Sequence, residues 1–235
     1  MKLYNSGKAP AQTIMDLDGK LLDELDPAGK PILHLYEWER PSATYGYFIQ
    51  PEKHLDLKRA GERGVALARR PTGGGIVFHI WDLAFSFLMP SGHPAFSLNT
   101  LENYRFVNEA VLEAVGQLFD LNQAELIRKD AMSLGPNCQN FCMAKPTRYD
   151  VVHEGMKVAG AAQRKRKQGY LHQGTISLAF PDVGLLGEVL LSRDELVAAM
   201  EAYTFAPLGD DYDRLKEARE EVQKRLVQVL MEKLS

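Results

Sequence analysis

The stretch LARRPTGGGIVFHIWDLAFSFLM, residues 67–89, places three consecutive glycines beside segments that have the composition of β-strands. Segments 75–80 and 83–89 are short and rich in β-branched or aromatic residues, which favour strands. The glycines permit unusual backbone angles and let a ligand approach the chain closely. Backbone N–H groups there, together with Arg69 and Arg70, suit an anion. The glycine stretch therefore fits a flexible turn and an anion-binding loop equally well.

The rest of the chain adds strands and helices without a repeating strand-helix-strand pattern. Helical spacing of apolar residues occurs in four segments, with Ser6 as a candidate cap of the first: 9–25, 100–118, 193–201 and 212–234. Further strands are expected at 31–39, 43–50 and 64–70, and two or three more between 148 and 180, with tight turns at Glu154–Gly155 and Lys167–Gly169. This order predicts an α+β fold, with one largely antiparallel sheet, in a single domain over residues 1–235.

The composition is that of a globular protein and argues against several classes of function. Of 235 residues, 45% are hydrophobic and 25% are charged, and no apolar run approaches the roughly 20 residues of a membrane span. A net charge of -3 argues against nucleic acid as the partner. No segment resembles a signal peptide, and two cysteines are too few for a disulfide framework. We expect a cytoplasmic protein with no membrane partner, whose cysteines are reduced.

Lys157 lies in the segment GMKVAGAA, where small residues follow the lysine and would leave space around its ammonium group. Most lysines are solvated, so Lys157 alone indicates no site. Two further features favour a functional role. The glycine stretch is one, and the other is the group of polar residues His172, Gln173 and Thr175 in an otherwise apolar strand.

Three motifs follow one another along the chain: RRPTGGGIVFH, KVAGAAQR and HQGTISL. In this order they resemble the catalytic domain shared by lipoate–protein ligase A and the cysteine-dependent octanoyltransferases, within the biotin and lipoate protein ligase superfamily. The resemblance covers about residues 10–200. It implies a mixed sheet flanked by helices, a hydrophobic tunnel for an eight-carbon acyl chain, and transfer of that acyl group to a lysine on a small acceptor domain. Little chain follows the last predicted helix, so no C-terminal accessory domain is expected.

The resemblance also implies roles for particular residues. Lys157 takes the place of the active-site lysine, whose ammonium stabilises negative charge on an acyl oxygen or on a leaving phosphate. The residues expected to contact the substrate are Arg70, Gly73, Gly74, Gly75, His79, Gly160, His172, Gly174 and Thr175.

Two positions depart from the family pattern. Ile80 follows His79 where aspartate is frequent, so that the nearest acid is Asp82. Gln173 stands where histidine is usual, with His172 displaced by one residue. A shift of one residue along a strand reverses the face that a side chain occupies, so the role of His172 stays open.

A reactive cysteine distinguishes the two mechanisms that the resemblance implies: the octanoyltransferases carry the acyl group on a cysteine, whereas the lipoate–protein ligases need no thiol. The segment CMAKPTRYDVVHEGMK resembles the octanoyltransferase pattern, with Cys142 fifteen residues before Lys157. A neighbouring ammonium would stabilise the thiolate, which is the reactive form of cysteine. This favours an octanoyl-carrier-protein:protein octanoyltransferase that forms a Cys142 thioester and needs no cofactor. Cys142 also fits a small core residue, and Cys138 with Cys142 would be half of a metal site, but no second cysteine pair exists and no metal is expected.

Two other functions stay open. An ATP-dependent lipoate–protein ligase, acting through lipoyl-adenylate, would need ATP and Mg, whereas a non-catalytic relative would only bind acyl groups or carrier domains. The octanoyltransferase would take acyl carrier protein as donor and a lipoyl-accepting domain as acceptor, from the glycine cleavage H protein or a 2-oxoacid dehydrogenase subunit. The basic run QRKRKQG, residues 163–169, fits a solvated turn or a patch that steers acidic partners.

Overall fold

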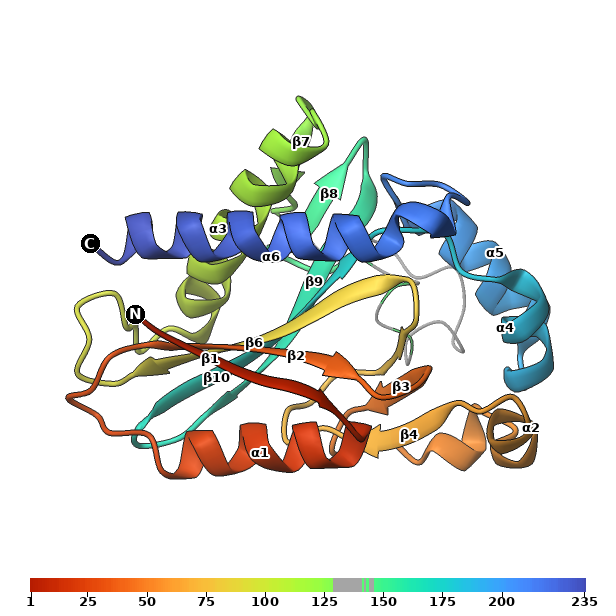
Figure 1. Ribbon diagram of the computed structural model, residues 1–235, viewed down its shortest axis with the longest axis horizontal. Coiled ribbons are helices and arrows are strands. Elements are labelled where there is room, and N and C mark those ends of the chain that lie inside the picture. Colours follow the sequence, from red (N-terminus) through yellow and green to blue (C-terminus); the bar gives the residue numbers. More distant parts are fainter. Residues whose placement is uncertain (129–140, 142, 144–145) are drawn as a thin grey trace.

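A seven-stranded sheet forms the centre of the molecule (Figure 1). The computed structural model describes residues 1–128, 141, 143 and 146–235. In spatial order the strands are β1 (Lys2–Ala9), β2 (Ile32–Trp38), β6 (Asp82–Pro90), β10 (Gly169–Ser177), β9 (Met156–Lys165), β8 (Val151–His153) and β7 (Ala124–Leu126). β1 and β2 run parallel, and every other neighbouring pair runs antiparallel. The prediction of a mixed, largely antiparallel sheet is confirmed.

Three shorter strands form a separate sheet in the order β4 (Ala66–Arg69), β3 (Ser42–Tyr45) and β5 (Ile76–His79). The expectation of one common sheet is wrong for these strands. β3 also stops earlier than its composition predicts, because Gly46 turns the chain toward the glycine loop, residues 71–75. Gly46 N donates to Gly75 O at 3.3 Å, Tyr47 N donates to Thr72 O at 3.0 Å, and a Cβ at position 46 would overlap the loop backbone. These N–H groups bond to the loop instead of to a neighbouring strand.

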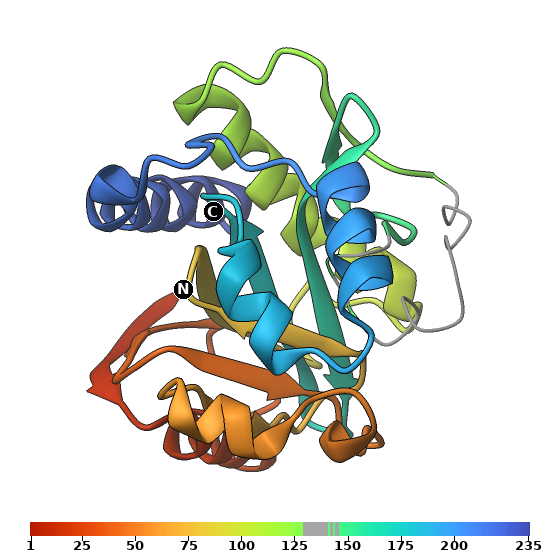
Figure 2. The same cartoon turned by 90° about the vertical axis from the view of Figure 1, so that its right-hand side faces the viewer.

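Helices cover both faces of the large sheet. On one face lie α3 (Thr100–Leu118) and α6 (Leu215–Lys233), which bury Phe87, Val111 and Leu226 in the main core. On the opposite face lies α1 (Ala11–Asp23), beside the smaller sheet. Around the smaller sheet pack α2 (Leu57–Glu62), α4 (Val183–Val189) and α5 (Arg193–Tyr203), as Figure 2 shows from the side. Two short 3-10 turns, η1 (Pro51–Lys53) and η4 (Tyr212–Arg214), precede α2 and α6.

The four helices predicted from periodicity are confirmed as α1, α3, α5 and α6, but β1, α2 and α4 are not predicted. Ser6 does not cap α1. Ser6 lies in β1 with its Oγ 2.8 Å from His34 Nε2, and α1 begins after Pro10. None of the helices in the described ranges combines the length and apolar character that a membrane span requires.

A fully buried carboxylate, Asp18, joins α1 to the large sheet. Its Oδ1 lies 2.7 Å from His34 Nδ1, and its Oδ2 accepts hydrogen bonds from Ser86 Oγ and from Gln173 Nε2, each at 2.6 Å. Gln173 Oε1 in turn accepts from Thr72 Oγ1 at 2.6 Å. A buried carboxylate is tolerated only when donors surround it. Here the donors come from three strands of the large sheet, and Asp18 reaches them from α1. The chain of bonds therefore fixes the glycine loop against α1 and the sheet.

Candidate active site

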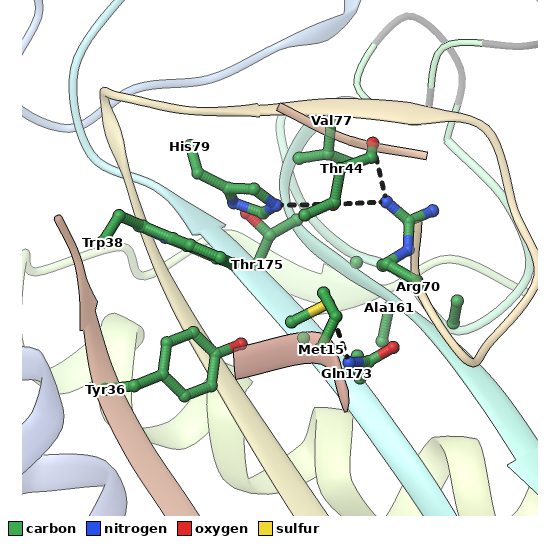
Figure 3. Close-up of a pocket in the computed structure, with 13 residues that line it drawn as sticks. Met15, Tyr36, Trp38, Thr44, Arg70, Val77, His79, Ala161, Gln173 and Thr175 are labelled. Atoms are coloured by element: carbon green, nitrogen blue, oxygen red, sulfur yellow. Dashed lines mark hydrogen bonds between the residues drawn. The ribbon is translucent and has the colours of Figure 1, made fainter. Parts of the chain in front are cut away.

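A cavity lies between the two sheets, with Met15 of α1 in its wall (Figure 3). We call it the inner cavity. Its other lining residues come from Arg70 and from β2, β3, β5, β9 and β10: Tyr36, Trp38, Thr44, Val77, His79, Gly160, Ala161, Ala162, Gln173, Gly174 and Thr175. Its volume of about 30 Å³ has room for about one or two water molecules. Polar groups and apolar side chains therefore meet in a small space.

Arg70 is buried and holds the glycine loop in shape. Its Nη1 donates to Thr44 Oγ1 at 2.6 Å and to Thr44 O at 3.0 Å, and its Nη2 donates to Gly75 O at 2.7 Å and to Gly73 O at 3.1 Å. Between these carbonyls, Gly74 has a φ of 85°, which only glycine adopts without strain. The guanidinium therefore ties two loop carbonyls to β3 while it lines the inner cavity.

His79 is oriented by a carboxylate three residues further along the chain. Its Nδ1 lies 2.7 Å from Asp82 Oδ2, and its Nε2 lies 2.8 Å from Thr44 Oγ1. Since a carboxylate only accepts, Nδ1 carries a proton and donates a hydrogen bond to Asp82. Thr175 Oγ1 donates to the same Asp82 oxygen at 2.5 Å, and the Trp38 ring stacks on His79 with the centroids 4.5 Å apart. The turn from β5 to β6 thus brings an acid to His79 although none follows it directly.

Lys157 and Asp150 form a buried ion pair near the start of β9. Lys157 Nζ lies 2.7 Å from Asp150 Oδ2, and both side chains are almost inaccessible to solvent. Asp150 also accepts from Thr147 N at 2.7 Å, from Thr147 Oγ1 at 2.9 Å and from Tyr104 OH at 2.7 Å. Burial and the nearby carboxylate raise the pKa of Tyr104 well above its ordinary value, so its hydroxyl stays a donor. These donors hold the carboxylate, and through it the ammonium, in one position.

Gly160 leaves the space that Lys157 occupies. A Cβ at position 160 would lie 2.5 Å from Lys157 Nζ and 2.7 Å from Asp150 Oδ1. Gly160 pairs with Thr175 across the ladder between β9 and β10 and lines the inner cavity. The ammonium group therefore lies next to the wall of the inner cavity, in the space expected from the small residues after the lysine.

His172 lies away from the inner cavity. Its ring packs between Tyr104 and Phe85, with centroid distances of 5.4 Å and 6.1 Å, on the face of the sheet that α3 covers. Burial lowers the pKa of His172 to about 3, so the ring is neutral. Gln173, the next residue along β10, lines the inner cavity instead. The structure therefore brings Gln173, and not His172, to the other predicted residues.

Both cysteines, Cys138 and Cys142, lie outside the described residues. Within the described ranges, no group of three or more histidine, cysteine, aspartate or glutamate side chains is arranged to hold a metal ion.

The two residues that flank Cys142 are described. Phe141 is buried and forms a β-bridge with the first residue of β5, directly after the glycine loop. Met143 O accepts a hydrogen bond from Thr204 Oγ1 at 3.0 Å, and Thr204 forms a β-bridge with Lys157. The chain therefore contacts the residue that directly follows the glycine loop just before Cys142, and a neighbour of Lys157 just after it.

The predicted residues mostly converge on this region. Five of them line the inner cavity: Arg70, His79, Gly160, Gly174 and Thr175. The glycine loop is bound to Arg70, and Lys157 lies beside Gly160. Asp150 and Tyr104 are not predicted from the sequence as site residues. The only signal for Asp150 is its place in the segment PTRYD, and Tyr104 has none, because it reaches the site from α3.

Several known proteins are similar to this chain in sequence and fold. The lipoyl protein ligase A/B catalytic domain matches residues 10–204. The octanoyltransferase LipM of Lysinibacillus sphaericus is 34% identical over 197 residues, which are 81% of this chain and 70% of that protein. A solved lipoate-protein ligase A bound with ATP has a TM-score of 0.75 and 26% identity, over 99% of this chain and 85% of that chain. A bipartite lipoate protein ligase from Thermoplasma acidophilum, described with its E2 lipoyl domain, has a TM-score of 0.72 and 26% identity, over 99% and 83% of the two chains. This chain belongs to the lipoyl protein ligase A/B catalytic domain family.

Proposed function

We propose that this protein transfers an octanoyl group to a lysine of a lipoyl-accepting protein, with Cys142 carrying the group as a thioester. One observation carries the proposal. The residues on either side of Cys142 contact Ile76, which directly follows the glycine loop, and Thr204, which is itself bridged to Lys157. The similarity to octanoyltransferase LipM supports the same reaction.

The chemistry needs a thiolate and a fixed positive charge. In the first step the Cys142 thiolate attacks the thioester carbonyl of an octanoyl donor, and the bond from the carbonyl carbon to the donor sulfur breaks. The donor thiolate leaves and takes up a proton. The Lys157 ammonium, held by Asp150 and Tyr104, stabilises the Cys142 thiolate and the oxyanion that forms during attack.

In the second step the neutral amine of the acceptor lysine attacks the Cys142 thioester. The amine loses a proton, an amide forms, and the bond from the carbonyl carbon to Cys142 Sγ breaks, which regenerates the thiolate. Exchange of one thioester for another is nearly thermoneutral and amide formation is downhill, so the reaction needs no ATP. Because Cys142 acts only as a reduced thiol, we place the reaction in the cytoplasm.

The acyl chain enters the inner cavity in this proposal. A cavity of about 150 Å³ holds benzene, whereas the inner cavity measures about 30 Å³, so an eight-carbon chain requires lining side chains to move. Met15 is the candidate, because an unbranched thioether side chain adapts easily to new neighbours. Gly160, Gly174 and Thr175 would then lie along the bound chain, while Arg70 and His79 keep the glycine loop in place.

The partners are an acyl donor and a protein acceptor. We propose a lipoyl-accepting domain as acceptor, since the similar ligase of T. acidophilum is described with an E2 lipoyl domain. We propose acyl carrier protein as donor, because it delivers an octanoyl group as a thioester and the Cys142 reaction begins from a thioester.

A second candidate function is ATP-dependent ligation of free lipoate. The similarity to a lipoate-protein ligase A bound with ATP favours it. In that reaction ATP and Mg would activate lipoate as an adenylate, Lys157 would stabilise charge on the leaving phosphate, and Cys142 would be dispensable.

One experiment separates these functions. The wild-type protein and its Cys142→Ala variant are each incubated with a lipoyl-accepting domain, either with octanoyl-carrier protein and no ATP or with free lipoate, ATP and Mg. The acceptor is then weighed by mass spectrometry. We expect octanoylation by the wild type alone and only from the carrier protein. Equal transfer by the variant, or transfer only with ATP, contradicts the thioester mechanism, and no transfer under either condition indicates a protein that only binds.

A further inference from the structure

A second cavity opens beside the inner cavity, and three of its residues form an unusual cluster. Its volume is about 600 Å³, and it shares Met15 and Arg70 with the inner cavity. We call it the arginine groove, after the cluster of Tyr47, Arg69 and Arg164 in its wall. A ligand that extends from the inner cavity past Met15 and Arg70 therefore enters the arginine groove.

Both arginines lie against the same tyrosine ring. The guanidinium carbon of Arg69 is 4.9 Å from the centroid of the Tyr47 ring, and that of Arg164 is 5.8 Å from it. Arg164 Nη1 also donates to Pro71 O, at the start of the glycine loop, at 2.8 Å. Cation–π contact with the half-exposed Tyr47 ring holds both guanidinium groups at the entrance of the site. The bond to the loop also holds Arg164.

The acidic side chains of the arginine groove have other partners. Asp16 accepts from Gln12 at 2.8 Å, Asp23 pairs with Arg166 at 3.7 Å, and Glu24 pairs with Lys20 at 3.9 Å. No ion pair joins Arg69 or Arg164 to a carboxylate in the part of the chain that the structure describes. Two like charges are thus held on one ring without a carboxylate between them, an arrangement that an anion would stabilise.

We infer that the arginine groove binds a phosphate ester group on the acyl donor. A guanidinium matches the oxygens of a phosphate in a bidentate geometry, and two of them converge here. The inference rests on the proposed transfer from a thioester donor, because such a donor presents its acyl group on an extended arm. With the acyl chain in the inner cavity, the arm passes Arg70 and its phosphate reaches Arg69 and Arg164.

Two donors that differ only in the phosphate test this inference. Octanoyl-phosphopantetheine and octanoyl-pantetheine carry the same thioester and the same arm, and only the first has a phosphate. We expect the wild-type protein to show a kcat/KM for octanoylation of the acceptor domain about tenfold higher with the phosphorylated donor, an advantage that falls as salt is raised. Arg69→Gln and Arg164→Gln should each remove most of this advantage, so that the kcat/KM of each variant with the phosphorylated donor falls toward its own kcat/KM with octanoyl-pantetheine.

Lys167→Gln is the matched control, because it removes one positive charge from the exposed tip of the same hairpin but neither from the lining of the arginine groove nor from a partner of its carboxylates. It should keep the preference for the phosphorylated donor. Equal rates of the wild type with both donors overturn the inference, and so does an equal fractional loss with both donors in Arg69→Gln, whose side chain has no bond to the glycine loop within the described residues. If the arginine variants instead raise the KM for ATP in a lipoate-dependent reaction and leave both thioester donors unaffected, the phosphate belongs to a nucleotide and the inference is wrong. Failure of octanoyl transfer itself is distinct, since the wild type would then be inactive with both donors.

Discussion

Replacement of Gly160 by alanine tests whether the position of Lys157 decides the rate. The added Cβ would lie 2.5 Å from Lys157 Nζ and 2.7 Å from Asp150 Oδ1, whereas such atoms need about 3.5 Å. The ammonium must therefore move by about 1 Å, and a displacement of this size costs about 100-fold in rate at an active site. We expect kcat for octanoylation of the acceptor domain, followed by mass spectrometry, to fall by about that factor.

Stability should fall as well, because the substitution strains a buried ion pair. Loss of one partner from such a pair costs about 3–5 kcal/mol, and displacement of the ammonium without its removal should cost about 3 kcal/mol at most. Gly61→Ala is the control, since a Cβ at position 61 of α2 meets nothing within 4 Å. It should raise the free energy of unfolding in urea by about 1 kcal/mol and leave kcat unchanged. A Gly160→Ala variant with the wild-type rate would refute the reasoning.

Three further substitutions test other parts of the structure. Asp82→Asn weakens a charged hydrogen bond to His79 worth about 1.5 kcal/mol, so kcat should fall about tenfold, and an unchanged kcat would show that His79 needs no orientation by Asp82. His172 has a pKa of about 3 in the folded protein and an ordinary pKa of about 6.5 when unfolded. Between these values only the unfolded state binds the proton, so stability is lost as the pH falls. The wild type should lose about 2 kcal/mol from this residue between about pH 7.5 and pH 5, and His172→Gln should lack this part of the pH dependence in urea unfolding. Leu226→Ala should lower the free energy of unfolding by about 2–5 kcal/mol, because Leu226 is fully buried where α6 packs on the sheet, while kcat stays at the wild-type value; a smaller cost would mean that α6 packs loosely.

The fold could be predicted from the sequence where local pattern decides structure. Apolar spacing predicts α3 at the residues where the structure has it, because one face of that helix packs on the sheet. Strand composition does not reveal which strands pair, so the separate sheet of β3, β4 and β5 is not predicted. The early end of β3 depends on contact between Gly46 and the glycine loop, which are distant in the sequence.

In the candidate site, too, the residues within local motifs are predicted, and those placed by contacts between distant segments are missed. Arg70, His79, Gly160 and Lys157 are predicted because they lie within two short motifs, RRPTGGGIVFH and KVAGAAQR. Asp150 gives only a weak signal, because its ion pair with Lys157 forms only when the turn that holds Asp150 lies beside the start of β9. For the arginine groove the sequence marks Arg69 and the basic run that contains Arg164 separately, but not that they meet, since they come from different strands and converge only over a tyrosine ring.

The two alternating residues of β10 show what pattern reasoning resolves and what it leaves open. Strand periodicity predicts that His172 and Gln173 point to opposite faces, but not which of them faces the site. The structure settles this through Asp18, a residue far away in the sequence that binds Gln173 inside the protein.

The most direct test of transfer through Cys142 is the intact mass of the protein itself. The wild type, with Cys142→Ser as the matched variant, is mixed with octanoyl-carrier protein in the absence of both ATP and acceptor. A single octanoyl adduct, mapped to Cys142, absent from the variant and passed to a lipoyl-accepting domain on its addition, is the predicted result. No adduct on a wild-type protein that still modifies the acceptor, or an adduct of equal yield on the variant, would contradict transfer through a Cys142 thioester.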